Sequence, residues 1–449
     1  MLIYLLCVVL VGLPVMVAEV LIGRRGRLNP VGSFHALRPA TPWKMTGFLG
    51  LLAGFMILSY YAVVAGWTVE YIQKSVTWEY ADYESHVTDH EVGERLMGEV
   101  GASGAAAPSD ADAALAEFRK GFSSDHAFRE ALASKKMEMF PERLFHDFLA
   151  DPVKQIAYFL VFMVLSVLVV IGGISGGIER WNRILMPLLL LMLAVLVVRV
   201  LMLPGGRSAM RFLFWPDFSN LSLDMVLWAL GQAFFSMSLG MGALLTYGSY
   251  LPKDANIGTA CLAIAGLDTI VALSASVVIF GSIASYGLVM KGSGIGNLFT
   301  AIPVIFMQMP GGQWLCILFY LLVSFAALTS AVSLLEVVSS YLIDEKRMSR
   351  RRAVITAGTI IFVVGVPCAL SFNLLADFKV LGRTVFDLFD FFCANLALPV
   401  GGILISVFVG WELTTQEKKE ELSEFSPTVF RSWNFLVRVV APVAILMVL

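Results

Sequence analysis

Long apolar stretches alternate with short polar segments along most of this chain. A stretch of about 18 to 25 apolar residues is long enough to cross a bilayer core of roughly 30 Å as a helix. We expect a single transmembrane domain over 1–449, with a long extracytoplasmic loop at 78–151 and an extracytoplasmic re-entrant or surface loop at 290–311. The pattern predicts an all-α membrane protein with about ten spans, at 2–22, 45–73, 153–172, 181–203, 225–250, 257–289, 312–343, 352–372, 384–411 and 430–449.

The fifth predicted span has an unusual centre, Ser236-Met237-Ser238-Leu239-Gly240-Met241-Gly242. Each glycine weakens a helix by about 1 kcal/mol relative to alanine. Backbone that leaves a helix at membrane depth needs new partners, because lipid offers no hydrogen bonds. The pattern predicts a broken helix near the bilayer midplane, where many secondary transporters bind an ion and a polar substrate. A closely packed, glycine-rich crossing of two helices is the alternative interpretation.

Basic residues indicate which loops are cytoplasmic. Lys and Arg follow the first, third, fifth and seventh spans, and such residues are typical of cytoplasmic loops. The loop at 79–151 instead holds sixteen Asp and Glu against seven Lys and Arg, so we predict that it is extracytoplasmic. Its part from 111 to 149 has a helical composition.

Composition supports the membrane assignment and excludes other classes. Of the residues, 58% are hydrophobic and 15% are charged, whereas a soluble domain carries about 25% charged residues. A net charge of −2 without a basic stripe excludes a nucleic-acid partner. The lipid bilayer is the expected partner, and the oligomeric state, including a homo-oligomer, stays open. The five cysteines lie in apolar segments without metal-type spacing, which favours core packing.

Oxygen-bearing side chains in other spans are candidates for ion binding. Asp268 lies within the sixth span, where an unpaired carboxylate costs several kcal/mol, so a functional role is the default interpretation and a structurally paired acid the alternative. Ala326, Thr329 and Ser330 share one helical face. Such hydroxyls often only bond back to their own backbone. Tyr61, taken alone, reads as an ordinary buried or interfacial tyrosine.

A serine-hydrolase interpretation is weak. Gly173, Ser175 and Gly177 match the GxSxG pattern, but a nucleophile elbow follows a strand, and here an apolar helix precedes the motif. All five histidines lie in loops. We therefore expect that the chain is not an enzyme.

Several motifs occur in a fixed order along the chain: Gly12-Leu13-Pro14 with Glu19 and Gly23-Arg24, Tyr60-Tyr61 with Gly66-Trp67, Gly173 to Arg180, Phe214-Trp215-Pro216-Asp217-Phe218, Gly231-Gln232 to Gly242, and Ala326-Ala327-Leu328-Thr329-Ser330. In this order and spacing they resemble the neurotransmitter:sodium symporter family, which has the LeuT fold of inverted five-helix repeats. The resemblance covers essentially the whole chain. It implies a sodium-coupled symporter that imports a neutral, hydrophobic amino acid by alternating access across the inner (plasma) membrane.

The resemblance also implies roles for individual residues. Two sodium sites are implied, with Ser236 and Asp268 at one and Ala326, Thr329 and Ser330 at the other. A fixed charge on Asp268, with Ala272 where chloride-dependent relatives have a serine, implies that chloride is not required. Tyr250 and Asp344 resemble parts of a cytoplasmic gate, and Asp390 the acid of an extracellular gate. The implied substrate pocket is formed by Ile57, Tyr61, Phe235, Ser236, Ser238, Met241, Gly242, Ser330, Ser333 and Leu334.

The front of the chain departs from the family pattern. The ten spans resemble family helices two to eleven, and the family's first helix, which supplies much of both sodium sites, has no counterpart. Two alternatives to a sodium symporter therefore stay open: a non-transporting fragment, and a proton-coupled carrier on the same fold with Asp268 as the titrating group.

Overall fold

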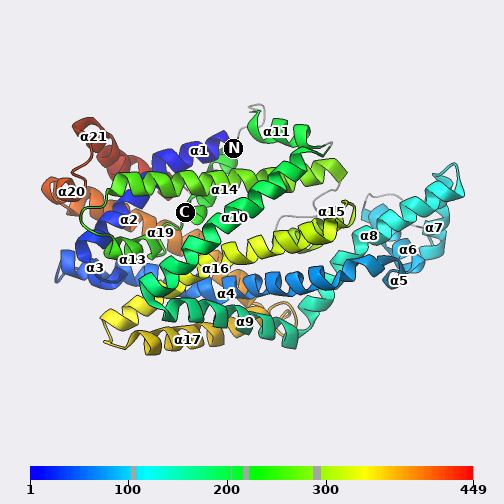
Figure 1. Cartoon of the computed structure of the whole chain (residues 1–449), viewed down its shortest axis with the longest axis horizontal. Helices are drawn as coiled ribbons and strands as arrows, with labels where there is room; N and C mark the ends of the chain where they lie inside the picture. Colours follow the sequence, from blue (N-terminus) through cyan, green and yellow to red (C-terminus); the bar gives the residue numbers. More distant parts are fainter. Residues whose placement is uncertain (103–107, 204, 216–221, 287–294, 448–449) are drawn as a thin grey trace.

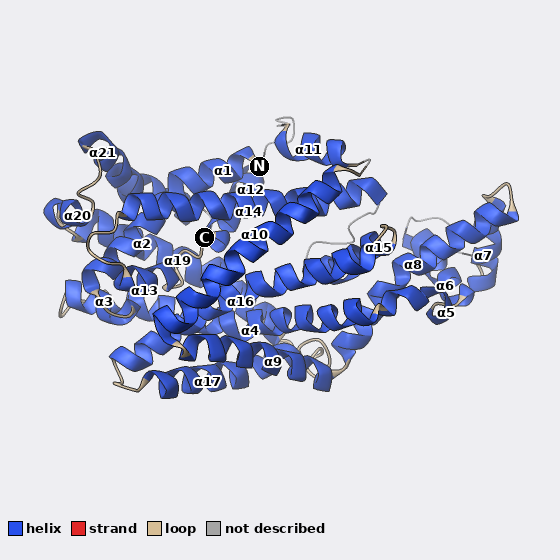
Figure 2. Cartoon of the chain, viewed as in Figure 1, coloured by secondary structure: helices blue, strands red, loops and turns tan. Residues whose placement is uncertain are grey.

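The protein is almost entirely helical (Figures 1 and 2). The computed structural model describes residues 1–102, 108–203, 205–215, 222–286 and 295–447. In this part of the chain the β-type pairing is an isolated bridge between Val380 and Arg383. Nine helices of the described part are long and apolar enough to cross a membrane, which confirms the all-helical membrane architecture.

The nine spans follow the predicted ranges closely. Several are continued through a π-helical segment, labelled η; η2 (Glu79–Asp82), outside the spans, is a 3-10 helix. They are α1–η1–α2 (Leu2–Cys7, Val8–Gly12, Leu13–Gly26), α4 (Lys44–Thr77), α9 (Pro152–Ile171), η3–α10 (Ile174–Glu179, Arg180–Leu201), α14 (Ile257–Tyr286), α16 (Gly312–Asp344), α17 (Arg350–Leu370), α18–η4–α19–η5 (Val385–Phe392, Cys393–Ala397, Leu398–Val407, Phe408–Glu412) and α21–η6–α22 (Pro427–Phe435, Leu436–Val440, Ala441–Leu446).

The remaining predicted span, 225–250, consists of two shorter helices, α12 (Leu223–Ser236) and α13 (Ala243–Tyr250). Three other short helices connect or cover the spans: α3 (Pro30–Leu37), α11 (Gly206–Phe214) and α20 (Thr415–Glu421). The 290–311 loop contains α15 (Asn297–Met307), whereas 290–294 lie outside the described residues, as do Pro216 to Phe218 of the motif before α12.

Helix α4 is the central element of the larger hydrophobic core, where it packs against α9, α16 and α17. Its small residues allow close approach of neighbouring backbones. A Cβ added at Gly66 would lie 2.8 Å from the backbone nitrogen of Phe159. The next residue, Trp67, is buried and packs edge-to-face against Phe145, Phe299 and Phe372. This packing fixes the position of α4, the helix that also carries Ile57 and Tyr61.

Helices α2 and α13 touch through their backbones. A Cβ at Gly248 would lie 2.6 Å from the carbonyl oxygen of Val20, and one at Gly23 would overlap the carbonyl of Leu245. Any larger residue at either glycine would push the two helices apart. The second half of the broken span is thereby held directly against α2.

The loop at 78–151 forms a helical module at one end of the molecule (Figure 1). It contains η2 (Glu79–Asp82), α5 (Tyr83–His86), α6 (Asp89–Ala102), α7 (Ala111–Lys120) and α8 (Asp125–Ala150). Val87, Val92, Leu132 and Phe140 form a small hydrophobic core within it. Helix α15 packs against α8, so the two predicted extracytoplasmic loops lie together.

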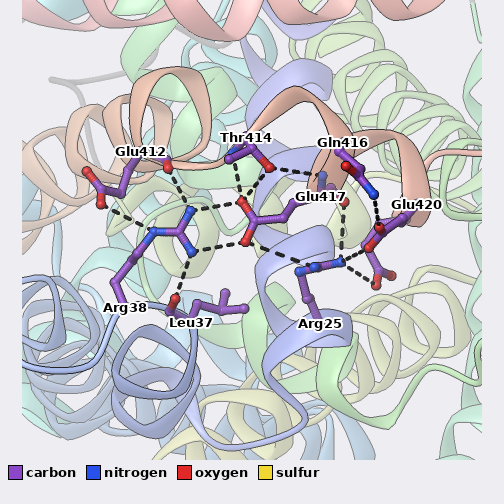
Figure 3. Close-up of polar contacts among 9 residues, drawn as sticks. Arg25, Leu37, Arg38, Glu412, Thr414, Gln416, Glu417 and Glu420 are labelled. Atoms are coloured by element: carbon purple, nitrogen blue, oxygen red, sulfur yellow. Dashed lines mark hydrogen bonds and ion pairs between the residues drawn. The ribbon is translucent and has the colours of Figure 1, made fainter.

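At the opposite end, α20 is held by ion pairs to the segments around α2 and α3 (Figure 3). Arg38 donates from Nη1 to Oε1 of Glu417 at 3.0 Å and from Nη2 to Oε2 at 2.8 Å. Arg38 also pairs with Glu412, and Arg25 pairs with Glu420. The hydrogen bonds from Arg38 lower the pKa of the Glu417 carboxyl to about 2. Glu417 therefore stays ionised throughout the neutral range.

Candidate functional site

The fifth predicted span breaks where the sequence indicates. Helix α12 ends at Ser236, α13 begins at Ala243, and the six residues between them are not helical. Ser238, Gly240 and Gly242 have positive φ angles of 56°, 79° and 77°. Left-handed conformations are easiest for glycine, which explains why two of these three positions lack a side chain.

The break is held by groups from other helices. The Gly240 N–H donates a 2.6 Å hydrogen bond to Oε1 of Glu19 on α2, and Glu19 is fully buried. On its other side, a Cβ at Gly240 would lie 2.5 Å from the carbonyl oxygen of Leu398 at the start of α19. The unwound segment therefore fits tightly between α2 and α19.

A cavity of about 520 Å³ opens beside this break. Its wall comes from α4, α10, α12, α13, α14 and α16 and from the unwound segment itself. Gly242 is the predicted pocket residue that does not line it, and it caps the N-terminus of α13 instead. The predicted residues that line the cavity are Ile57, Tyr61, Phe235, Ser236, Ser238, Met241, Asp268, Ala326, Thr329, Ser330, Ser333 and Leu334.

One corner of the cavity is polar. The hydroxyls of Tyr4 and Ser236 are 3.0 Å apart, and both interact with the Asp268 carboxylate. Oδ2 of Asp268 is buried without a protein hydrogen-bond partner. A carboxylate oxygen and two nearby hydroxyls are hard oxygen ligands of the kind that cations such as Na⁺ prefer.

On the α16 wall of the cavity, hydroxyl groups donate hydrogen bonds to the backbone of their own helix. This was the alternative interpretation of these side chains. Thr329 donates to the carbonyl of Ala326 at 2.8 Å, and Ser333 donates to that of Thr329 at 3.0 Å. Ser333 also pairs with the Tyr247 hydroxyl at 2.8 Å. Ser330 differs, because its hydroxyl faces Tyr61 across the cavity. Each oxygen still has a free lone pair, so backbone bonding does not remove these groups as cation ligands.

The residues predicted as gates lie away from the central cavity. Tyr250 donates a 2.7 Å hydrogen bond to Glu336, which Arg350 also holds at 2.6 Å. Asp344 accepts hydrogen bonds from the backbone and side chain of Asn29, at 2.8 and 3.2 Å.

At the opposite side of the break, Asp390 lines a second cavity of about 470 Å³ together with Gln232 and Asn395. Phe235 lines both cavities, so it stands between them.

Comparison with known proteins identifies the family. The model of the sodium:neurotransmitter symporter family matches residues 1–449. The chain belongs to the sodium:neurotransmitter symporter family. The predicted family is thus confirmed, and the protein is a sodium-dependent, multi-pass membrane transporter rather than an enzyme.

Relatives support this assignment over the full chain. YhdH of Bacillus subtilis (strain 168), an uncharacterized sodium-dependent transporter, is 34% identical over 450 residues, which cover 100% of this chain and 88% of the relative. A sodium-dependent transporter of Haemophilus influenzae is 29% identical over 454 residues, covering 100% and 88%. The crystal structure of MhsT in complex with L-phenylalanine superimposes with a TM-score of 0.81 at 36% identity, covering 100% of this chain and 90% of MhsT. This match confirms the LeuT fold.

Several polar residues of this transporter were not singled out from the sequence. Tyr4 joins the polar corner, Tyr247 bonds Ser333, and Glu336 and Arg350 form the ion pair beside Tyr250. Glu336 had the same signal as Asp268, an acid inside an apolar span. The two tyrosines had no comparable signal, because tyrosines are common in membrane helices.

Proposed function

We propose that this transporter is a sodium-coupled symporter that imports a neutral, hydrophobic amino acid by alternating access. The observation that carries the proposal is the cavity beside the α12–α13 break, where apolar side chains and oxygen ligands face the same space. The site lies where secondary transporters bind substrate, at a discontinuous helix.

The wall of the cavity favours an apolar substrate side chain. Ile57, Met186, Leu189, Met241 and Leu334 are among the apolar residues that line it. A volume of about 520 Å³ lies within the usual range for small-molecule sites. MhsT, the structural relative, was crystallised with L-phenylalanine. We infer that the substrate is an aliphatic or aromatic neutral amino acid.

The broken helix suits the charged ends of an amino acid. The C-terminal end of α12 presents carbonyl dipoles that attract an ammonium group, and the N-terminal end of α13 presents N–H dipoles that attract a carboxylate. Tyr61 would donate its hydroxyl to the substrate carboxylate.

We propose two sodium sites. Ser236 and Asp268 would hold one ion, and Ala326, Thr329 and Ser330 the other. The Asp268 carboxylate would supply the negative charge for which chloride-dependent relatives use a bound anion, so chloride would not be needed. Tyr250 and Asp344 would close the cytoplasmic side, and Asp390 with Phe235 the extracytoplasmic side.

The test is uptake by the purified protein in proteoliposomes with an inward sodium gradient. We expect uptake of L-phenylalanine or L-leucine, little uptake of L-glutamate, and loss of uptake when choline replaces sodium. Equal uptake in choline would contradict sodium coupling. Uptake in choline driven by a proton gradient would favour the proton-coupled alternative.

A matched pair of variants on α16 tests the site. Ser330 lines the cavity, whereas Ser339 is buried on the same helix without a hydrogen-bond partner. Ser330→Ala should raise the sodium concentration needed for half-maximal uptake several-fold, and Ser339→Ala should not. Equal effects of the two variants would argue against the second sodium site.

A further inference from the structure

Two groups of basic residues lie at the end of the molecule that the charge pattern predicts to be cytoplasmic, and they differ in their partners. The first group, Arg24, Arg25 and Arg38, is paired with glutamates of α20 and its flanks. Figure 3 shows the pairs of Arg25 and Arg38. The second group lies on the turn between α16 and α17 and on the first turn of α17. Its members Lys346, Arg347, Arg351 and Arg352 are exposed and make no ion pair or side-chain hydrogen bond within the described part of the chain.

The segment carrying the second group is held in place by other contacts. Arg350 binds Glu336 through both terminal nitrogens, at 3.1 and 2.6 Å, and donates from Nε to the carbonyl of Val170 at 3.0 Å. The Met348 N–H donates to the carbonyl of Leu342. Arg347 adopts a left-handed conformation with φ of 51°. Lys346 and Arg347 are therefore presented by a short, fixed turn between two spans, and Arg351 and Arg352 by the first turn of α17.

The acids close to this turn leave an excess of positive charge. Residues 344–352 contain five basic and two acidic residues, a net charge of +3. Both acids, Asp344 and Glu345, are engaged by Asn29 of the segment before α3. They do not reach the four unpaired cations within ion-pair distance. Glu336 neutralises Arg350, so the four unpaired cations exceed the two acids of this segment by a charge of +2.

An apolar stripe continues directly from these cations along α17. Ile355 follows Arg352 by three residues and Arg351 by four, so it lies one helical turn below them. Ile355, Ile360 and Val363 are 44%, 48% and 60% exposed, which marks this face as lipid-facing. The cations suit the headgroup of an anionic phospholipid, and the apolar stripe below them suits its acyl chain.

We propose that Lys346, Arg347, Arg351 and Arg352 bind the phosphate headgroup of an anionic phospholipid in the cytoplasmic leaflet, whose acyl chain lies along the exposed face of α17. Unpaired Lys and Arg immediately outside a span attract anionic headgroups electrostatically. The second basic group would gain lipid contacts in place of the glutamate contacts that the first group makes within the protein. The site is separate from the central cavity and does not depend on the identity of the substrate.

The test is a titration of the purified, delipidated full chain with dioctanoyl phosphatidylglycerol, followed by its thermal unfolding midpoint. We expect phosphatidylglycerol to raise the midpoint and dioctanoyl phosphatidylcholine to raise it much less. High salt should weaken the phosphatidylglycerol effect, since screening acts strongly on exposed charges. Equal effects of the two lipids would overturn the proposal, and an equal effect of inorganic phosphate would overturn its assignment to a lipid.

Variants test whether the four unpaired basic residues cause the effect of phosphatidylglycerol. Combining Lys346→Gln, Arg347→Gln, Arg351→Gln and Arg352→Gln should weaken apparent phosphatidylglycerol affinity roughly tenfold or more, given the contribution of each basic residue near an anionic surface. The charge-preserving set Arg347→Lys, Arg351→Lys and Arg352→Lys should retain most of the affinity. If the glutamine variant does not fold, unchanged affinity in the wild type at high salt overturns the proposal by itself.

A control with the same loss of charge uses the helical module at the other end of the molecule. Arg119→Gln, Lys120→Gln, Arg129→Gln and Lys135→Gln remove four positive charges from α7 and α8. This control should bind phosphatidylglycerol as the wild type does. Equal losses in the control and in the glutamine variant would show a net-charge effect and overturn the proposed site.

Discussion

The backbone N–H of Gly240 donates a 2.6 Å hydrogen bond to the carboxylate of Glu19, a residue 221 positions earlier in the chain. The contact joins α2 to the unwound segment between α12 and α13. Glu19 is fully buried, and its second carboxylate oxygen has no hydrogen-bond partner among the described residues, so the bond to Gly240 anchors the unwound segment to α2.

Removing this acceptor should destabilise the protein. Glu19→Ala leaves the Gly240 N–H buried without a partner, which costs about 1 to 3 kcal/mol. Glu19→Gln keeps an oxygen that can accept the bond and should cost less. Thermal unfolding in detergent measures both, with the exposed Glu420→Ala as control. A Glu19→Ala protein as stable as the wild type would contradict this role.

Two glycines of the same span should respond oppositely to alanine. Gly240 has a φ of 79°, and a Cβ there would lie 2.5 Å from the Leu398 carbonyl, so Gly240→Ala should destabilise by more than about 1 to 2 kcal/mol and abolish uptake. Gly231 lies inside α12 with no atom within 4 Å of an added Cβ. Gly231→Ala should therefore be neutral, or stabilising by up to about 1 kcal/mol. Similar unfolding midpoints for the two variants would argue against a strained break.

Asp268→Asn should separate the shape of the ion site from its charge. The amide retains an oxygen ligand but removes the negative charge beside Tyr4 and Ser236. We expect uptake by the wild type to be unchanged when gluconate replaces chloride. The variant should show weaker sodium activation or a new chloride requirement. Normal uptake by the variant in gluconate would mean that the carboxylate charge is not used.

The Arg38–Glu417 pair should make acid stability depend on Arg38. The folded protein holds the pKa of Glu417 at about 2, below the ordinary value of 4.5, so its stabilising contribution is complete above the ordinary value and is lost as pH falls toward 2. Arg38→Gln should therefore lower the unfolding midpoint at pH 7 and lower it less at pH 4. A difference from the wild type that grows on acidification would exclude this explanation.

The chain organisation was largely predictable from local pattern. The lengths of the apolar stretches predicted the spans, and the serines and glycines from 236 to 242 predicted the break. Each of these signals lies within a single stretch of the sequence. The shared face of Ala326, Thr329 and Ser330 was also predictable, since helical spacing alone determines it. These residues line the cavity as the spacing and the family resemblance indicated.

The partners of the polar residues were not predictable in the same way. Glu19 meets Gly240, and Tyr4 meets Ser236, only because α1 and α2 pack against α12 and α13 over more than two hundred residues of sequence. No single-segment pattern encodes such pairs. The glutamates of α20 likewise meet arginine partners from the start of the chain, almost four hundred residues earlier.

Helix α4 is continuous from Lys44 to Thr77, a length of roughly 50 Å, well beyond the roughly 30 Å of a bilayer core. It lines the cavity through Ile57 and Tyr61, and its far end leads directly into the helical module of residues 79–150. At this length, a tilt of about 5° at the base of the helix would move its tip by roughly 4 Å. A fluorophore on the module would report motion around the cavity from outside the membrane, with no label near the substrate.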